Sequence, residues 1–511
     1  MKILTFILLL SGLLGCSQLL QPDQSDPDQS DREHIDLPTA PDGSGFTGER
    51  FSVRADDGEL PADVARELPA REVRTLDFET ASYVIYELRD GVAMDEVTGE
   101  LNRLEGVSAE ATRTFQLFDS SAVNAPAYEQ EIQYAPQIVG AESAWDSATG
   151  DGVTVAVVDT GIRGGHREFG EEAFAEGGFD YIADEEIEPG ENRDNNGHGT
   201  HVAGIVAARA YNGVGMAGLS WGATLMDFAV FNDEGGANSA DIAAAIERAV
   251  NEGADIINLS LGSARSDQIT RSAVQYALDS DVVVVAATGN TGYATTNFPA
   301  YYPGVIAVGS TDARDELSYY STTGAHTTVV APGENIFSSV HGSDSAYAMF
   351  DGTSMSSPLV AGAAALLLEA NDELTHGQVK RILKETAVDI GLEANRMGAG
   401  RIDAGAAVSE AHDPPEDYGN IHVTVENTDG ATEADVEVLL LDENGETVFR
   451  RAVSSDGSSS SDGNDAVEEG VAYFTALPDQ MYTVAIQGDS ESVNVDTGET
   501  IEATLTVDTS E

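Results

Sequence analysis

Short apolar runs in the middle of the chain restrict its fold more than any other feature of the sequence. The run Val153–Val158 is apolar except for Thr154, and Asp281–Ala287 contains four valines in succession. Such runs are typical of strands in parallel sheets, where helices cover both faces. A helical pattern at Asp241–Asn251 and a further strand at Asp255–Leu259 continue the alternation. We therefore predict an α/β domain with a parallel sheet.

Polar residues follow these predicted strands directly. Asp159 comes after the first strand, Ser260-Leu261-Gly262 after the second and Thr288-Gly289-Asn290 after the third. The carboxyl ends of parallel strands meet at one edge of the sheet, where α/β proteins bind their ligands. This edge is therefore the candidate functional site.

Two predicted helix starts add further polar side chains. In Phe350–Pro358, Gly352 allows a tight turn and Ser354 then begins a helix of small residues. By itself this string is equally compatible with a Ser/Thr-rich helix cap. The string Asp194–Gly204 combines a polar turn with a small-residue helix that starts at His198.

Three of these side chains match the needs of nucleophilic catalysis. A hydroxyl becomes a good nucleophile when a neutral imidazole takes its proton, and a buried carboxylate must fix the tautomer of that imidazole. Asp159, His198 and Ser354 supply the three groups. We interpret them as a candidate triad.

The stretch Tyr134–Ala411 resembles the subtilisin-like serine proteases, or subtilases. The motifs that carry the resemblance are Asp159-Thr160-Gly161, His198-Gly199-Thr200-His201 and Gly352-Thr353-Ser354-Met355-Ser356-Ser357-Pro358. The chain order Asp, His, Ser is known for that family. The resemblance implies a subtilisin-like fold and peptide hydrolysis, in which Asp159 orients, His198 acts as base and then acid, and Ser354 attacks.

The resemblance also assigns an oxyanion and a substrate site. Asn290 would donate to the oxyanion, although an Asn after Gly is by itself more often a turn residue. Segments near 234–236 and 260–262 would pair with an extended peptide, and Ala287–Gly289 would line the pocket for the residue before the cut. None of the pocket residues is charged, which argues against a strict dibasic preference, while Glu234 would favour a basic residue further along. The substrate-binding candidates are Gly235, Gly236, Ser260, Leu261, Gly262, Ala287, Thr288 and Gly289.

The chemistry needs no cofactor, and a structural calcium ion is the one ligand that the resemblance suggests. Glu168 stands where the family often has a ligand carboxylate, and Asn212 stands near its calcium loop. The acidic stretch Asp180–Asp194 is a second place for an ion, with solvated surface as the alternative. The metal ligands stay unassigned. The segment Phe298-Pro299 resembles a family turn in which the proline is cis.

The charge of the chain is strongly negative. Its 511 residues include 89 Asp and Glu against 25 Lys and Arg, a net charge of -64. This balance excludes a nucleic-acid binder and suits high salt, because at about 1 M salt the screening length falls to about 3 Å. An acidic secreted enzyme from an ordinary habitat is the alternative.

The first 45 residues predict export and anchoring. Residues 1–15 have a positive start and a short apolar core, as in a signal peptide, and Leu13-Leu14-Gly15-Cys16 resembles a bacterial lipobox. A lipid on Cys16 would hold the protein on a bilayer of the cell envelope, which in a diderm would be the outer membrane; a chance cysteine is the alternative. Cys16 is the only cysteine, so a monomer has no disulfide, and we expect a monomer. Residues 16–45 are polar and predict a disordered tether.

Residues 46–125 predict a β-α-β-β-α-β domain, the ferredoxin-like order. The expected elements are Arg50–Ala55, Pro61–Leu68, Val73–Phe78, Ser82–Leu88, Met94–Leu104 and Ala111–Phe118. The domain resembles the inhibitory propeptide of subtilases, which predicts self-cleavage between Phe118 and Tyr134; a permanent accessory domain is the alternative. Residues 126–412 form the expected catalytic domain.

Residues 416–511 predict a small β-sandwich. Its expected strands are Ile421–Val425, Asp435–Leu441, Val471–Phe474, Tyr482–Ile486 and Ile501–Val507. Its sequence resembles prealbumin-like domains of secreted enzymes. For the whole chain we predict an exported, lipid-anchored serine endopeptidase that cuts extended peptides and matures itself; the alternative is an inactive scaffold of the same fold on the envelope.

Overall fold

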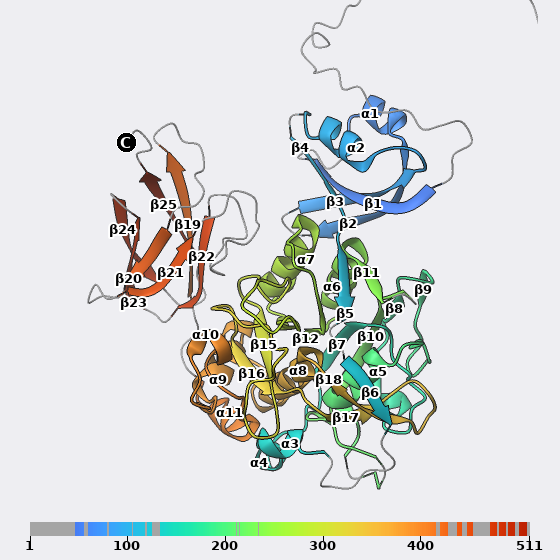
Figure 1. The fold of residues 1–511 in the computed structure, drawn as a ribbon, viewed down its shortest axis with the longest axis vertical. Helices are drawn as coiled ribbons and strands as arrows, with labels where there is room; N and C mark the ends of the chain where they lie inside the picture. Colours follow the sequence, from blue (N-terminus) through green and yellow to red (C-terminus); the bar gives the residue numbers. More distant parts are fainter. Residues whose placement is uncertain are drawn as a thin grey trace, which may run out of the picture.

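A computed structural model gives the fold (Figure 1). It describes residues 46–507 except 56–59, 79–80, 105, 118–119, 125–132, 211, 214, 233–234, 415–418, 428–436, 442–446, 453–470, 478–479, 487–488 and 496–499. The predicted signal peptide, Cys16, the tether and Glu234 lie outside the described residues.

An eight-stranded sheet forms the centre of the catalytic domain, in the order β16-β15-β14-β12-β7-β10-β8-β9. Its strands are parallel except for the edge strand β9, which pairs antiparallel with β8. The strands are β7 (Thr154–Asp159), β8 (Phe179–Asp180), β9 (Glu185–Glu186), β10 (Thr224–Ala229), β12 (Ile256–Leu259), β14 (Val283–Ala287), β15 (Ile306–Thr311) and β16 (Val329–Pro332). The predicted α/β class with a parallel sheet is confirmed.

Helices cover both faces of this sheet, because alternate residues of each strand enter different cores. Val155 and Val157 of β7 lie in one apolar cluster, with α5 and α8, whereas Ala156 and Val158 lie in the other, with α6 and α7. The helices are α3 (Ala135–Ile138), α4 (Ala141–Trp145), α5 (His198–Ala207), α6 (Ser239–Asn251), α7 (Gln268–Asp279), α8 (Thr353–Ala370), α9 (His376–Glu385), α10 (Ala394–Met397) and α11 (Ala404–Glu410), with a 3-10 turn at Glu171–Ala173.

The helix α8 is the central helix of the catalytic domain. It packs against α5 and against five strands of the sheet, β7, β12, β14, β15 and β16. Among the described helices it alone is long and apolar enough to match a membrane span, but 83% of that window is buried inside the protein. Its apolar composition is therefore that of a core helix.

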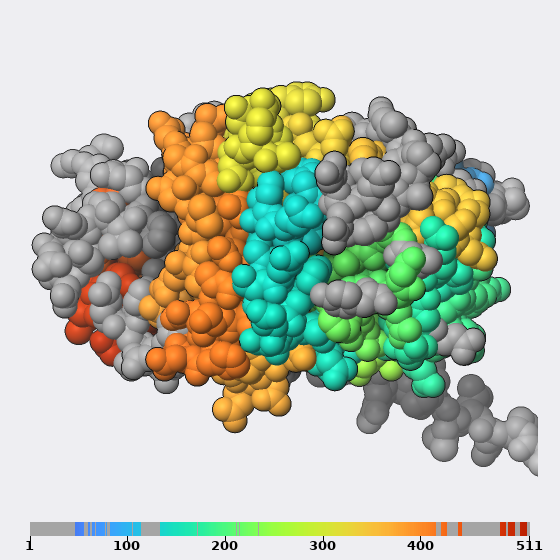
Figure 2. All heavy atoms as spheres, turned by 90° about the horizontal axis from the view of Figure 1, so that it is seen from below, coloured from blue at the N-terminus to red at the C-terminus, as the bar shows by residue number. Residues whose placement is uncertain are grey.

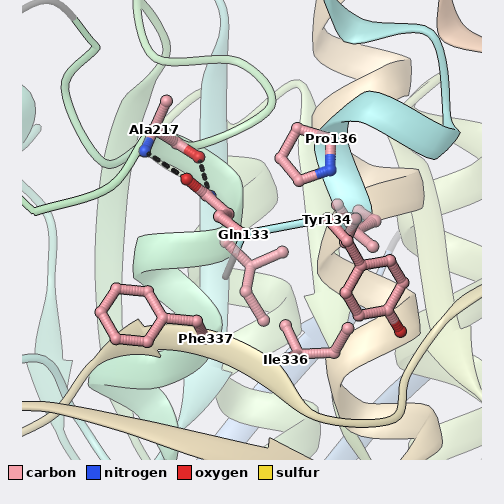
Figure 3. A pocket seen from close by; sticks show the side chains of 9 residues that line it. Gln133, Tyr134, Pro136, Ala217, Ile336 and Phe337 are labelled. Carbon is pink, nitrogen blue, oxygen red and sulfur yellow. Dashed lines mark hydrogen bonds between the residues drawn. The ribbon is translucent and has the colours of Figure 1, made fainter. Parts of the chain in front are cut away.

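The first described segment of the catalytic domain, from Gln133 to α4, packs against the rest of that domain. Gln133 donates from Nε2 to the carbonyl of Ala217 at 2.6 Å and accepts from the Ala217 N–H at 3.1 Å, beside a small apolar pocket (Figure 3). The segment then continues into α3 and α4, and α4 packs against α11; in the space-filling view this cyan stretch lies against the orange helices (Figure 2).

The N-terminal domain has the predicted ferredoxin-like order. Its antiparallel sheet runs β2-β3-β1-β4, and α1 and α2 contribute to a separate small core on one face. The elements are β1 (Phe46–Ala55), α1 (Ala62–Glu67), β2 (Ala70–Phe78), β3 (Ala81–Arg89), α2 (Met94–Leu101) and β4 (Val107–Ala111).

The other face of this sheet docks on α6 and α7 of the catalytic domain (Figure 1). Leu76, Phe78, Tyr83 and Ile85 belong to the same buried cluster as those helices. Polar contacts across the junction include Arg50 with both carboxylate oxygens of Asp241 at 2.8 and 3.0 Å, Tyr83 with Ser272 at 2.8 Å, and the Gln268 N–H with Glu110 at 3.1 Å. The two domains therefore share buried apolar and charged contacts.

The predicted strand Ala111–Phe118 is wrong, because the chain leaves the N-terminal sheet within it. The strand β4 ends at Ala111, and Thr112 still donates to the carbonyl of Arg50, but Arg113 donates to Ser239 of the catalytic domain at 2.8 Å. A second strand, β5 (Thr114–Leu117), then pairs with β11 (Gly236–Asn238) and β13 (Leu261–Gly262). The alternation of apolar residues predicts a strand, but it does not predict which other strand it pairs with.

A third strand follows after residues 118 and 119, which lie outside the described part. It is β6 (Ser120–Asn124), and it pairs antiparallel with β18 (Tyr347–Asp351), which pairs on its other edge with β17 (Ile336–Ser339). The strands β5 and β6 are thus two successive extended pieces of the chain, and both pair with strands of the catalytic domain.

The C-terminal domain is a sandwich of two sheets with one shared core, as predicted. Its strands are β19 (Gly419–Asn427), β20 (Glu437–Leu441), β21 (Thr447–Ala452), β22 (Val471–Leu477), β23 (Gln480–Ile486), β24 (Asp489–Val495) and β25 (Thr500–Val507). The strands β21 and β24 were not predicted, since their residues are largely polar and lack a clear alternation. The resemblance to prealbumin-like domains stays a prediction.

Candidate active site

Asp159 and His198 form a buried pair at the carboxyl edge of the sheet. Asp159 ends β7 and His198 begins α5, and both side chains are fully buried. His198 Nδ1 lies 2.7 and 2.9 Å from the two carboxylate oxygens of Asp159. Because a carboxylate only accepts, Nδ1 carries the proton and Nε2 is the basic nitrogen.

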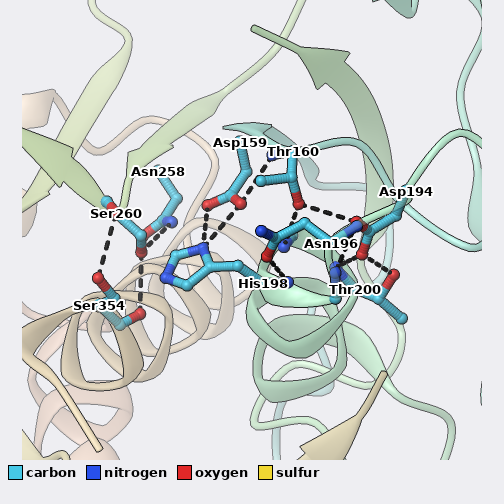
Figure 4. Close-up of polar contacts among 11 residues, drawn as sticks. Asp159, Thr160, Asp194, Asn196, His198, Thr200, Asn258, Ser260 and Ser354 are labelled. Atoms are coloured by element: carbon cyan, nitrogen blue, oxygen red, sulfur yellow. Dashed lines mark hydrogen bonds and ion pairs between the residues drawn. The ribbon is translucent and has the colours of Figure 1, made fainter. Parts of the chain in front are cut away.

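Asp194 fixes the loop that carries His198, a role that sequence reasoning missed. Its carboxylate accepts from the N–H groups of Asn196, Gly197 and Thr200 and from the hydroxyls of Thr160 and Thr200 (Figure 4). These bonds tie the turn after Asp159 to the first turn of α5. Asp194 is the first residue of the motif Asp194–Gly204, which contains His198. An acidic residue close to a helix start often accepts hydrogen bonds from the first N–H groups of the helix, so this role of Asp194 could have been predicted from the sequence.

Ser354 lies in the first turn of α8, on the other side of the His198 ring (Figure 4). Its hydroxyl donates to the carbonyl of Ser260 at 3.2 Å, and the Ser260 hydroxyl donates to the carbonyl of Ser354 at 2.9 Å. This pair of bonds fixes the start of α8 against the end of β12. Gly352, just before the helix, has φ 158°, and Gly352 N–H donates to the carbonyl of Gly333.

Asn290 lies beside the same helix start. Its Oδ1 accepts from both the N–H and the hydroxyl of Thr353, each at 3.0 Å. With Oδ1 fixed in this way, the donor end of the amide, Nδ2, points away from Thr353. The structure therefore brings together all four predicted catalytic candidates.

The predicted substrate segments flank a backbone strand. Gly236 opens β11, Leu261 and Gly262 form β13, and β5 pairs with both strands, with Leu117 opposite Leu261. Gly235 adopts φ 78° with no atom near its α-carbon hydrogens, so the turn before β11 needs glycine for its backbone angle.

The predicted pocket residues lie at the end of β14. Ala287 is the last residue of that strand, and Thr288 donates its hydroxyl to the carbonyl of Thr322 at 3.0 Å. Gly289 has φ 99° and lies so close to Asn297 that a β-carbon there would approach Asn297 Nδ2 to 2.1 Å. The predicted cis peptide at Phe298-Pro299 is confirmed.

The second histidine of the H-G-T-H motif has a structural role. His201 is fully buried, its Nε2 lies 3.0 Å from the carbonyl of Ile336, and its ring stacks on Phe350 at 4.3 Å. Burial, followed by the nearby His198, lowers the pKa of His201 to about 3. His201 is therefore neutral whenever His198 acts as a base.

The two predicted calcium candidates, Glu168 and Asn212, lie close enough for a side-chain hydrogen bond. Glu168 is buried, and burial raises the pKa of its carboxyl group, but the Tyr347 hydroxyl and the Met216 N–H both donate to Oε1. No group of three or more His, Cys, Asp or Glu side chains in the described part could hold a metal. A structural calcium ion at Glu168 stays a prediction, and no step proposed below uses a metal.

The acidic loop Asp180–Asp194 gathers its carboxylates around a guanidinium. Arg193 lies 3.1 Å from Glu185, 3.1 Å from Glu191 and 3.8 Å from Asp180. The positive charge among these three carboxylates is therefore that of Arg193, a side chain of the same loop.

The fold and the site define an α/β protein with an Asp–His pair and a helix-start serine at the carboxyl edge of its sheet. The sequence profile described as "Subtilase family" matches residues 150–406. The chain belongs to the subtilase family, as the motifs predicted.

Named relatives are similar to the catalytic region. Thermitase of Thermoactinomyces vulgaris is 38% identical over 281 residues, which are 55% of this chain and 97% of thermitase. The halolysin-like extracellular serine protease Nep of Natrialba magadii is 38% identical over 309 residues, 59% of this chain. The chain spans only 55% of the length of that halolysin-like protein.

A solved structure supports the fold beyond the catalytic domain. Fervidolysin of Fervidobacterium pennivorans aligns with 92% of this chain and 80% of its own, with a TM-score of 0.69 and 22% identity. At that identity the comparison speaks for the fold alone, and the predicted subtilisin-like fold is confirmed.

Proposed function

We propose that the protein is an exported serine endopeptidase that hydrolyses extended peptides through an acyl-enzyme. The observation that supports this best is the buried His198–Asp159 pair, because it directs Nε2 of His198 toward the side where Ser354 lies (Figure 4). The alternative, an inactive scaffold of the same fold, would not need all four catalytic side chains. This chain contains all of them, Asp159, His198, Ser354 and Asn290, so we favour the enzyme.

The proposed chemistry starts with a turn of the Ser354 hydroxyl from the Ser260 carbonyl to His198 Nε2. His198 takes the proton as Ser354 Oγ attacks the scissile carbonyl carbon, and Asp159 stabilises the imidazolium. The oxyanion accepts from Asn290 Nδ2 and the Ser354 N–H. His198 then gives the proton to the leaving amine, and water, activated by the same histidine, releases the acyl group and restores Ser354.

A fluorophosphonate probe tests this assignment directly. We expect one label per chain, located on Ser354 by peptide mass spectrometry, because only a hydroxyl activated by His198 reacts quickly with such a probe. Labelling should be absent in Ser354→Ala and strongly reduced in His198→Ala. A label confined to some other serine would contradict the triad.

The pairing of β5 and β6 supports self-processing. The strand β5 ends at Leu117 opposite Leu261, which follows Ser260, and β6 begins at Ser120 opposite Asp351, three residues before Ser354. Ser260 and Ser354 are hydrogen-bonded to each other, so the two pairings lie on either side of the nucleophile. We propose that the N-terminal domain is a propeptide and that the cut falls in the peptide bonds between residues 117 and 120, at or just before the start of the predicted window from Phe118 to Tyr134.

Lipid anchoring is the second part of the proposal, and it rests on the Leu13-Leu14-Gly15-Cys16 string. We expect Cys16→Ala to remove the protein from the membrane fraction, because the attached acyl chains would be its anchor. Ser17→Ala is the matched control, since it changes the neighbouring residue and leaves the cysteine. Membrane retention of Cys16→Ala equal to that of the control would contradict lipidation.

The acidic surface supports a halophilic enzyme, in line with the halolysin-like relative. We expect the thermal midpoint of unfolding to rise between dilute buffer and about 2 M salt, since salt screens repulsion among the carboxylates. Sodium chloride and potassium chloride at equal ionic strength should act alike if screening is the cause. A midpoint that does not move would remove the halophilic assignment.

A further inference from the structure

Asn258 is a polar residue in the interior of the catalytic domain, at a position where an apolar side chain is expected. It belongs to β12, which lies between β7 and β14, and it is fully buried. Ile256, two residues earlier and so on the same face of the sheet, belongs to the apolar cluster that includes α5 and α8. A buried amide costs free energy unless it is hydrogen-bonded, so its partners indicate what it does there.

The amide of Asn258 links the end of β12 to the beginning of α8. Its Nδ2 donates to the Ser260 hydroxyl oxygen at 3.0 Å (Figure 4), and its Oδ1 accepts from the Ser357 hydroxyl at 2.7 Å. The Ser260 hydroxyl in turn donates to the carbonyl oxygen of Ser354 at 2.9 Å. These side chains are all fully buried, which strengthens each hydrogen bond and makes a missing one costly.

This network fixes the backbone of the nucleophile. A hydroxyl has a single hydrogen and is free to rotate, but because Asn258 donates to Ser260 Oγ, the hydrogen of that hydroxyl is directed to the Ser354 carbonyl. On the other side of Ser354, Asn290 accepts from the N–H and the hydroxyl of Thr353. The Ser354 α-carbon is thus held on both sides, and the directions of its Oγ and its N–H are set.

We propose that Asn258 is a positioning residue for the nucleophile, acting through the Ser260 hydroxyl to hold Ser354 in the orientation from which Oγ attacks and the N–H donates to the oxyanion. This inference rests on the proposed peptidase function. Asn258 itself is fully buried and makes no contact with the substrate, which pairs with β11 and β13. Loss of its amide should therefore lower the rate of the chemical step and leave substrate binding unchanged.

The test measures kcat and KM of the processed enzyme with one quenched-fluorescence peptide. Asn258→Leu removes both amide hydrogen bonds and keeps a side chain of similar size. We expect kcat to fall by roughly tenfold and KM to stay within about twofold, because a misplaced nucleophile loses rate and not affinity. The acid limb of the pH profile should not move, since the His198–Asp159 pair is untouched.

Two neighbouring serines of α8 provide a matched pair. Ser357→Ala removes only the bond to Asn258 Oδ1 and should lower kcat in the same way, by roughly threefold, since the amide keeps its bond to Ser260 but loses one of its supports. Ser356→Ala also removes a buried hydroxyl, but that hydroxyl donates to the Ala331 carbonyl, so this variant should lower the thermal midpoint and leave kcat unchanged. Equal kcat losses in Ser356→Ala and Ser357→Ala would overturn the proposal.

A double variant separates positioning from a general loosening of the domain. Ser260→Ala keeps the backbone carbonyl and removes the hydroxyl, so it should lower kcat about as much as Asn258→Leu, and the two together should be no worse than either alone. Additive losses, or an unchanged kcat in Asn258→Leu or in Ser260→Ala, would overturn the proposal. If Asn258→Leu does not fold, Ser357→Ala with and without Ser260→Ala gives the same comparison. Failure of the proposed function looks different, since then the unsubstituted enzyme cuts no peptide, or cutting survives Ser354→Ala.

Discussion

Ser354→Ala is expected to lower peptide hydrolysis by roughly a million-fold in kcat, the size known for subtilisin. The reason is geometric: the Ser354 hydroxyl lies between the Ser260 carbonyl and the His198 ring, in position to react (Figure 4). A quenched-fluorescence peptide provides the measurement. The residual rate then reports binding and the oxyanion donors alone.

Companion variants distinguish a catalytic unit from a loss of folding. His198→Ala should cost about as much as Ser354→Ala, and the double variant should be no worse, because the residues act together. Ser356→Ala is the matched control on the same helix. Its hydroxyl donates to the Ala331 carbonyl at 2.9 Å and touches no reacting group, so it should change stability more than kcat. Substantial activity in Ser354→Ala, or equal losses in Ser356→Ala, would end the assignment.

The parts of this site that could be predicted from sequence are those fixed by local pattern. Asp159 follows a buried strand, and His198 and Ser354 begin small-residue helices, so each was placed by the element it belongs to. The carboxyl ends of parallel strands lie at one edge of the sheet, so the three side chains were expected to lie close together there. The N-terminal β-α-β-β-α-β order likewise follows from alternation and turn residues, although its last strand is Val107–Ala111 and not the predicted Ala111–Phe118.

The parts that could not be predicted depend on which distant residues meet. The split between β4 and β5 is set by Ser239, which lies 126 positions beyond Arg113 and accepts its N–H. Likewise, Arg193 pairs with Asp180, Glu185 and Glu191, which all precede it in the same loop. The spacing of these carboxylates does not show that a guanidinium lies among them in place of a metal ion. Contacts between remote segments are a property of the folded chain.

Self-processing gives the second large effect. Purified Ser354→Ala protein is expected to keep its N-terminal domain joined to the catalytic domain, whereas the active protein should be cut nearly completely between residues 117 and 120. Because β5 is already paired between β11 and β13, the cut needs no second molecule. Its rate should therefore be independent of protein concentration, which intact mass measured over a dilution series will show.

The fate of the severed domain depends on the surface that β2 and β3 share with α6 and α7. Arg50 holds Asp241 with two bonds in a partly buried place, and Phe78 and Tyr83 lie in the common core, so we expect the domain to stay bound after the cut. Arg50→Ala should then release it, because Asp241 loses its partner; Arg54→Ala, on the same strand, is the matched control. If the cut domain stays bound, a lipid on Cys16 would hold the wild-type catalytic domain at the membrane through the Arg50–Asp241 contact. Arg50→Ala would then move peptidase activity into the soluble fraction. An uncut wild-type chain with full peptidase activity would show instead that the domain is a permanent spacer.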